Sequence, residues 1–206
     1  MAEVHTAAPI RDGYRVVPIV RGILAIAPAI VITFSQDHSV ALGQLVFGVW
    51  AVVSGVVVGA LALRFLVDRG IRWIFAVQAV LTAIAGILSL IVVPDLRFLV
   101  VLVIAWAAAT GVLELLAGLR AGRRTSASRD WLLVGGATAL AAIAFLVFPF
   151  DPVSIVGLLG AYLVIVGVLL VIGGLSLKGD GAPAEPAEPA EHADPRSDAP
   201  RSEPNS

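Results

Sequence analysis

The sequence predicts an all-α integral membrane bundle of six transmembrane helices, built from three parallel helical hairpins and followed by a disordered C-terminal tail. Two observations support this fold class. Hydrophobic residues make up 59% of the chain and charged residues only 14%, against roughly 25% charged residues in an average soluble domain. An internal repeat is also present, because WAVVSG at Trp50, WAAATG at Trp106 and YLVIVG at Tyr162 follow one another at a spacing of 56 residues.

Six apolar runs are long enough to cross a membrane, since about 20 residues at 1.5 Å each span a hydrocarbon core of roughly 30 Å. None of them alternates polar and apolar residues as a membrane β-strand does. The predicted spans are Val16–Phe34, Val40–Leu63, Trp73–Val93, Phe98–Leu119, Trp131–Phe148 and Val153–Leu177. They group into hairpin repeats over residues 16–67, 72–120 and 131–177.

The first span is predicted to be an uncleaved helix and not a signal peptide. Ala27-Pro28-Ala29 resembles a cleavage site, but Pro18 and Arg21 interrupt the run before it and hydrophobicity continues after it. The residues outside the hairpins form two further regions. Residues 1–15 are expected to be an N-terminal arm, and residues 178–206 an acidic tail rich in Ala, Glu and Pro that cannot bury enough apolar surface to fold.

Basic residues predict the orientation in the membrane. They gather in the N-terminal arm and in the connections after the second and fourth spans, whereas the three remaining connections contain only Arg97. The positive-inside rule therefore places both termini in the cytoplasm and the protein in the plasma (inner) membrane. Three hairpins that all start inside point the same way, unlike the inverted repeats of many transporters. The residues that predict the cytoplasmic side are Arg11, Arg15, Arg64, Arg69, Arg72, Arg120, Arg123, Arg124 and Arg129.

Small residues recur every seven positions in the second helix of each hairpin. Such a period keeps close helix contacts on one side of a left-handed crossing, and small residues let membrane helices approach each other. The predicted helix-packing glycines are Gly48 and Gly55 in the first repeat, Gly111 and Gly118 in the second, and Gly160, Gly167 and Gly174 in the third. Gly55 and Gly59 also form a GxxxG pair, and the alternative is that this pair joins two protomers of a homo-oligomer.

Three polar residues within the spans form a predicted polar layer. Arg21 and Gln78 occupy equivalent places in the first two hairpins, about one and a half turns from the cytoplasmic end, and Gly135 takes that place in the third. Glu114 lies about five residues from the cytoplasmic end of its span, at a similar depth. An Arg21–Glu114 ion pair completed by Gln78 is one hypothesis. The alternatives are side chains that extend to cytoplasmic water, or a path for protons or ions.

Each outward-facing turn contains one aspartate: Asp37, Asp95 and Asp151, with His38 beside the first. Asp is common in turns, so the ordinary explanation is turn geometry. The functional alternative is an acid-responsive cluster, because Asp titrates near 4 and His near 6.5 when unperturbed.

Motifs for catalysis and cofactor binding are absent from the sequence. It contains no HExxH, no GxxxxGK[ST], no GxSxG, no cysteine and no cluster of metal-ligand spacing. We therefore expect no enzymatic activity, no cofactor and no metal site. The arginine-rich loop RAGRRTSASR is better explained as a topology anchor that contacts anionic lipid than as a nucleic-acid site. The expected partners are the lipid bilayer, a second copy of the chain, and a cytoplasmic protein recruited by the tail.

The repeats resemble the HdeD family. The shared pattern is an apolar helix with an early glycine, as in Arg21-Gly22-Ile23-Leu24, a short outer turn, and an aromatic-xxxx-Gly helix that closes on arginine, as in TGVLELLAGLR from Thr110 to Arg120. The resemblance covers about residues 15–178. It implies a six-helix inner-membrane protein associated with acid resistance, without established catalytic residues. The expected function is envelope or acid-stress tolerance, and the alternative is a small proton or solute transporter that uses the polar layer.

Overall fold

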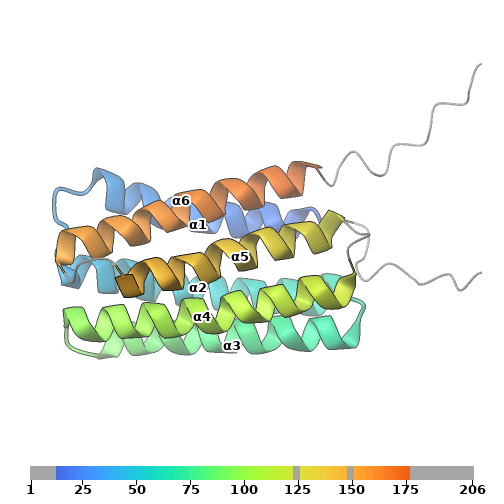
Figure 1. The fold of residues 1–206 in the computed structure, drawn as a ribbon, viewed down its shortest axis with the longest axis horizontal. Helices are drawn as coiled ribbons and strands as arrows, with labels where there is room; N and C mark the ends of the chain where they lie inside the picture. Colours follow the sequence, from blue (N-terminus) through green and yellow to red (C-terminus); the bar gives the residue numbers. More distant parts are fainter. Residues whose placement is uncertain (1–12, 123–125, 148–150, 177–206) are drawn as a thin grey trace, which may run out of the picture.

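The computed structural model describes residues 13–122, 126–147 and 151–176 of the chain. These residues form six α-helices joined by short connections (Figure 1). All six are long and apolar enough to cross a membrane. The predicted all-helical membrane fold is therefore confirmed, and the chain has the architecture of a multi-pass membrane protein. The helices are α1 (Val16–Phe34), α2 (Val40–Phe65), α3 (Arg69–Ile91), α4 (Leu96–Ala121), α5 (Ser126–Val147) and α6 (Pro152–Ser176).

The bundle has two distinct ends (Figure 1). At the terminal end lie the start of α1, the end of α6, the connection from α2 to α3, the end of α4 and the start of α5. At the hairpin end lie the turns from α1 to α2 and from α3 to α4, together with the end of α5 and the start of α6. The three hairpins therefore point the same way. The predicted tail, residues 178–206, and most of the predicted arm lie outside the described residues.

Helix starts differ from the apolar runs because capping residues set them. The Asp68 carboxylate accepts a hydrogen bond of 2.7 Å from the Ile71 N–H, so α3 begins at Arg69 and not at Trp73. In the same way the Asp95 carboxylate accepts from the Phe98 N–H at 2.7 Å, and α4 begins at Leu96. Hydropathy marks the apolar segment, whereas the side chain that bonds an otherwise unpaired N–H marks the first turn. The predicted ends at Phe148 and Leu177 lie outside the described residues.

The closest helix packing joins one hairpin to the next. The most extensive contacts are those of α2 with α3, α4 with α5 and α6 with α1, and the two helices of a hairpin contact each other less. Because α6 returns to α1, the six helices form a closed ring with approximate threefold symmetry. The hairpin is thus the unit of the sequence repeat, while the pair formed by neighbouring hairpins is the unit of packing.

The predicted glycine seam forms these close contacts. A Cβ atom at any of the seven seam glycines would come within 2.9 Å of an atom of the adjacent helix, which is too close for a side chain to fit. Contact at this distance supplies the van der Waals attraction that holds helices together in lipid. The three central crossings occupy equivalent positions of the repeat, and they pair Gly55 with Ala79, Gly111 with Gly135 and Gly167 with Gly22.

The GxxxG pair of α2 faces its own chain. A Cβ at Gly55 would lie 2.7 Å from the Ala79 carbonyl oxygen, and a Cβ at Gly59 would lie 3.3 Å from the Ala79 Cβ. The interpretation of this motif as a dimer contact is therefore wrong, because α3 already occupies the face that it presents. A homo-oligomer through another surface stays a prediction.

Apolar side chains fill the ring at both ends. The cluster nearer the hairpin end contains Phe47, Leu99, Phe145 and Leu159, each at most 1% exposed. The cluster at the terminal end includes Tyr14, which belongs to the predicted arm but is only 5% exposed. Its hydroxyl accepts a hydrogen bond of 2.7 Å from the Trp131 Nε1–H. The last residues of the arm therefore pack into the bundle instead of extending from it.

Candidate functional site

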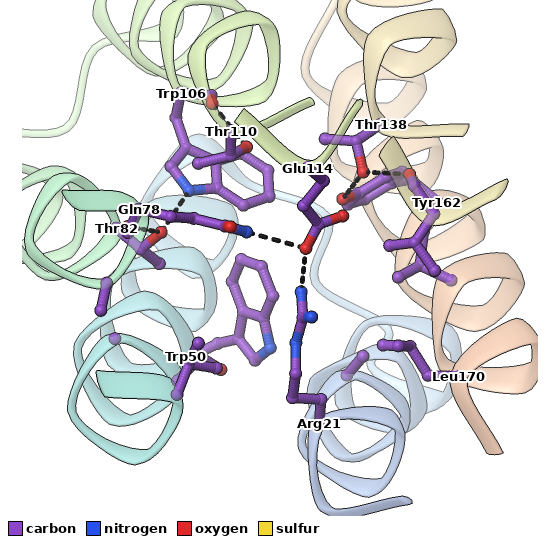
Figure 2. A pocket seen from close by; sticks show the side chains of 17 residues that line it. Arg21, Trp50, Gln78, Thr82, Trp106, Thr110, Glu114, Thr138, Tyr162 and Leu170 are labelled. Atoms are coloured by element: carbon purple, nitrogen blue, oxygen red, sulfur yellow. Dashed lines mark hydrogen bonds and ion pairs between the residues drawn. The ribbon is translucent and has the colours of Figure 1, made fainter. Parts of the chain in front are cut away.

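A cavity of about 50 Å³ lies at the centre of the ring (Figure 2). All six helices line it, and fifteen of its lining residues fall into five sets of three that occupy equivalent positions in the repeats. The cavity thus lies on the approximate threefold axis. The sets are Arg21, Gln78 and Val134; Ala25, Thr82 and Thr138; Trp50, Trp106 and Tyr162; Ser54, Thr110 and Val166; and Val58, Glu114 and Leu170.

An ion pair crosses this cavity. Arg21 of α1 donates from Nη2 to Glu114 Oε1 of α4, and α1 and α4 lie opposite each other in the ring. Gln78 of α3 donates from Nε2 to the same carboxylate oxygen at 2.8 Å. Figure 2 shows Glu114 between its two donors. The structure therefore brings together all three residues of the predicted polar layer.

The layer is buried inside the bundle. The Glu114 side chain is 2% exposed and the Arg21 side chain 12% exposed, so neither extends to the water beyond the membrane. The alternative of side chains that reach the interface is therefore wrong for this arrangement. Gln78 also lies deeper than predicted, about two and a half turns into α3, because the Asp68 cap starts that helix earlier.

The sequence spacing predicts Gly135 as the third member of the set with Arg21 and Gln78, but in the structure Val134 takes that place. Gly135 packs against Gly111, in the same register as Ala79 against Gly55. That register aligns the preceding residues, so Val134 points into the cavity with Arg21 and Gln78. A single residue of difference decides whether a position faces the axis or the neighbouring helix.

On the side of the ion pair that faces the hairpin end, Trp50, Trp106 and Tyr162 form a layer of edge-to-face contacts. The ring centroids of Trp50 and Trp106 are 5.2 Å apart, and those of Trp106 and Tyr162 are 6.0 Å apart. The second and third hairpins each satisfy the polar group of the ring with a threonine. Trp106 Nε1 donates to Thr82 Oγ1 at 3.1 Å, and the Tyr162 hydroxyl hydrogen-bonds Thr138 Oγ1 at 3.0 Å.

The first hairpin breaks this pattern. Ala25 occupies the position equivalent to Thr82 and Thr138, so it offers no hydroxyl to the Trp50 indole. In the part of the chain that the structure describes, four buried side-chain atoms have no hydrogen-bond partner, and all four belong to residues of this cavity. They are Trp50 Nε1, Ser54 Oγ, Gln78 Oε1 and Glu114 Oε2. Buried polar atoms are normally paired, so four unpaired atoms around one cavity indicate that it can hold a polar molecule.

The outward-facing aspartates serve as turn and cap residues. Asp37 accepts hydrogen bonds from Ser39, at 2.8 Å from its N–H and 2.9 Å from its hydroxyl. Asp95 caps α4, and Asp151 accepts from the Ser154 N–H at 2.9 Å at the start of α6. Within residues 13–122, 126–147 and 151–176, no hydrogen bond or ion pair joins these aspartates or His38 to each other.

Gln44 is a buried polar residue that the sequence analysis missed. It is 2% exposed and bridges α2 to the turn between α3 and α4. Its Nε2 donates to the carbonyls of Ser89 and Val92 at 3.1 and 2.9 Å, and its Oε1 accepts from the Asp95 N–H at 3.2 Å. The signal was available, because an amide within an apolar run requires a partner.

The comparisons with known proteins add no relative: no protein-family model, curated protein or solved structure matches the chain.

Proposed function

We propose that this chain is a non-enzymatic, multi-pass protein of the plasma (inner) membrane, with both termini in the cytoplasm, that contributes to envelope or acid-stress tolerance. The proposal extends the resemblance to the HdeD family. The observation that carries it is the placement of the Arg21–Glu114 pair between two apolar clusters. A carboxylate that ties the ring together while apolar side chains separate it from water suits a bundle that must keep its shape during acid exposure.

Acid survival of the host tests this function. Deletion of the gene should lower survival after acid challenge, and the intact gene should restore it. A Glu114→Gln variant should restore survival only in part, because Arg21 then lacks its counter-ion. A variant lacking residues 179–206 should restore it fully, because the six described helices close the ring without those residues. Equal survival of the deletion strain and its parent, at matched growth, would contradict the proposal.

A transport function is the second candidate, favoured by the four unpaired polar atoms around the cavity. In that case protons or a small solute would pass Arg21, Gln78 and Glu114 during a rearrangement that opens the apolar clusters. Flux into proteoliposomes under an imposed pH gradient distinguishes the two candidates. Flux that Glu114→Gln abolishes in a folded protein would favour transport, and flux no greater than in empty vesicles would favour the structural role.

A further inference from the structure

An apolar groove runs along the lipid-facing side of the first hairpin. Its volume is about 350 Å³, within the range of small-ligand pockets, about 300–1,000 Å³. Residues of α1 and α2 line it: Leu24, Ala27, Pro28 and Val31 from α1, and Leu45, Val46, Val49, Trp50 and Val53 from α2. The contact between α1 and α2 is among the least extensive of the neighbouring pairs in the ring.

Trp50 separates this groove from the central cavity, because it lines both. In Figure 2 its indole stands between α2 and Arg21 of α1. The same indole carries the unpaired Nε1–H, and Ser54, one turn further along α2, carries the unpaired hydroxyl. The hairpin that lacks the threonine partner thus also carries the groove on its outer face.

The four unpaired polar atoms of the cavity indicate which kind of ligand it can bind. Gln78 Oε1 and Glu114 Oε2 accept hydrogen bonds, Trp50 Nε1 donates one, and Ser54 Oγ can do either. The Arg21 and Glu114 charges balance each other, so an ion would bring an uncompensated charge into the membrane interior at a high cost. An uncharged group that donates and accepts, such as a hydroxyl, fits this set.

Access from the bilayer fits the packing better than access along the axis. Apolar clusters fill the ring toward the hairpin end and toward the terminal end of the cavity, whereas Trp50 lines both the cavity and the groove. A molecule that dissolves in lipid meets the groove directly, and its hydrocarbon chain finds there the apolar lining of α1 and α2.

We propose that the central cavity binds the hydroxyl head of a small, uncharged amphiphile, which enters from the bilayer past Trp50 and leaves its hydrocarbon chain in the groove between α1 and α2. A cavity of about 50 Å³ holds a head group of the size of one or two water molecules, since a water takes about 30 Å³ in the liquid. This inference goes beyond the proposed function, because binding requires neither acid tolerance nor flux.

Quenching of tryptophan fluorescence by brominated chains tests the proposal. The protein is reconstituted into lipid nanodiscs with Trp73→Phe, which removes an indole that is 63% exposed to lipid. The probe is 6-bromohexanol, and 1-bromohexane at the same membrane concentration is the matched control without a hydroxyl. We expect saturable quenching by the alcohol, beyond the linear quenching by the alkane.

Three variants and one control variant locate the site. Ala27→Leu fills the groove and should weaken the saturable phase at least threefold, while Ala105→Leu on the exposed face of α4 should leave it unchanged. Ser54→Ala removes one hydrogen-bonding group and should weaken it about three- to tenfold. Ala25→Thr supplies the hydroxyl found in the other two hairpins, and should weaken binding by pairing the Trp50 indole.

The outcomes are decisive in both directions. Saturable quenching by the alcohol that Ala27→Leu weakens and Ala105→Leu does not would support the proposal. Equal, linear quenching by the two bromides would overturn it. Saturable quenching that survives Ala27→Leu would also overturn it, because the chain would then lie elsewhere. Each result is independent of the survival and flux assays.

Discussion

The ion pair across the ring makes a double-mutant cycle the most direct test of how the bundle is held together. Glu114→Gln keeps the size and the polar character of the side chain but leaves the Arg21 charge without its counter-ion. Arg21→Met keeps an unbranched chain and leaves the Glu114 carboxylate, 2% exposed, without its counter-ion. The double variant removes both charges and creates no new contact.

The magnitude follows from the burial of the pair. Loss of one partner of a buried ion pair costs about 3–5 kcal/mol of unfolding free energy, mostly because the other charge stays buried. The hydrogen bond from Gln78 contributes little, since hydrogen bonds between transmembrane helices average about 0.6 kcal/mol. Arg21 keeps 12% exposure and its long chain can shift toward the terminal end. We therefore expect Glu114→Gln to cost about 3 kcal/mol, and the double variant to be more stable than either single variant.

The assay is equilibrium unfolding in lipid-detergent micelles by titration with sodium dodecyl sulfate, followed by circular dichroism. Arg15→Met is the matched control, because Arg15 is exposed at the start of the same helix and surface substitutions stay within about 0.5 kcal/mol. If the losses of the two single variants simply add in the double variant, Arg21 and Glu114 do not act as a pair and the reasoning fails.

Further variants test the packing, the Gln44 bridge and the α6 cap. Gly111→Leu should lower the free energy of unfolding by about 1–3 kcal/mol through overpacking, whereas Gly136→Leu, with nothing within 4 Å of its Cβ position, should not. Gln44→Leu should cost about 1–3 kcal/mol and speed amide exchange in the α3–α4 turn. Hydrogen bonds from the side chain and N–H of Ser154 lower the pKa of Asp151 below its ordinary value of 3.8. Protection of the Ser154 amide, followed by NMR, should therefore persist above 3.8 and disappear as the pH falls through the lowered pKa.

The fold could be predicted from sequence because its signals are local. The length and hydropathy of each run give the helices, and the 56-residue spacing gives the repeat. The seven-residue spacing of glycines also gave the packing face of the second helix in each hairpin. It did not give the partner, because a face that admits close approach is compatible with several neighbours. In the structure, the partner of α2 and of α4 is the first helix of the next hairpin, and the partner of α6 is α1.

The candidate site was predicted less completely. Equal depth along the helices was enough to relate Arg21 to Glu114, but not to tell Val134 from Gly135, which depends on the register of α5 against α4. For the same reason, the sequence alone could not show that the Trp50 indole N–H lacks a hydrogen-bond partner. Ala25 can be recognised as the position that lacks a threonine partner for the Trp50 indole only once the arrangement of the six helices is known.

The three hairpins carry similar small residues where neighbouring hairpins pack against each other, but different residues where all three face the central cavity. Glycine or alanine recurs at the central crossings, but none of the five sets that line the cavity holds three identical side chains, and they include one arginine and one glutamate. Three arginines in one layer would repel each other in a medium that does not screen them, and three glutamates would do the same. A homotrimer of identical hairpins therefore cannot build this layer. Fusion of the three copies into one chain lets a single positive and a single negative charge neutralise each other, and lets the first hairpin alone omit the threonine beside its indole.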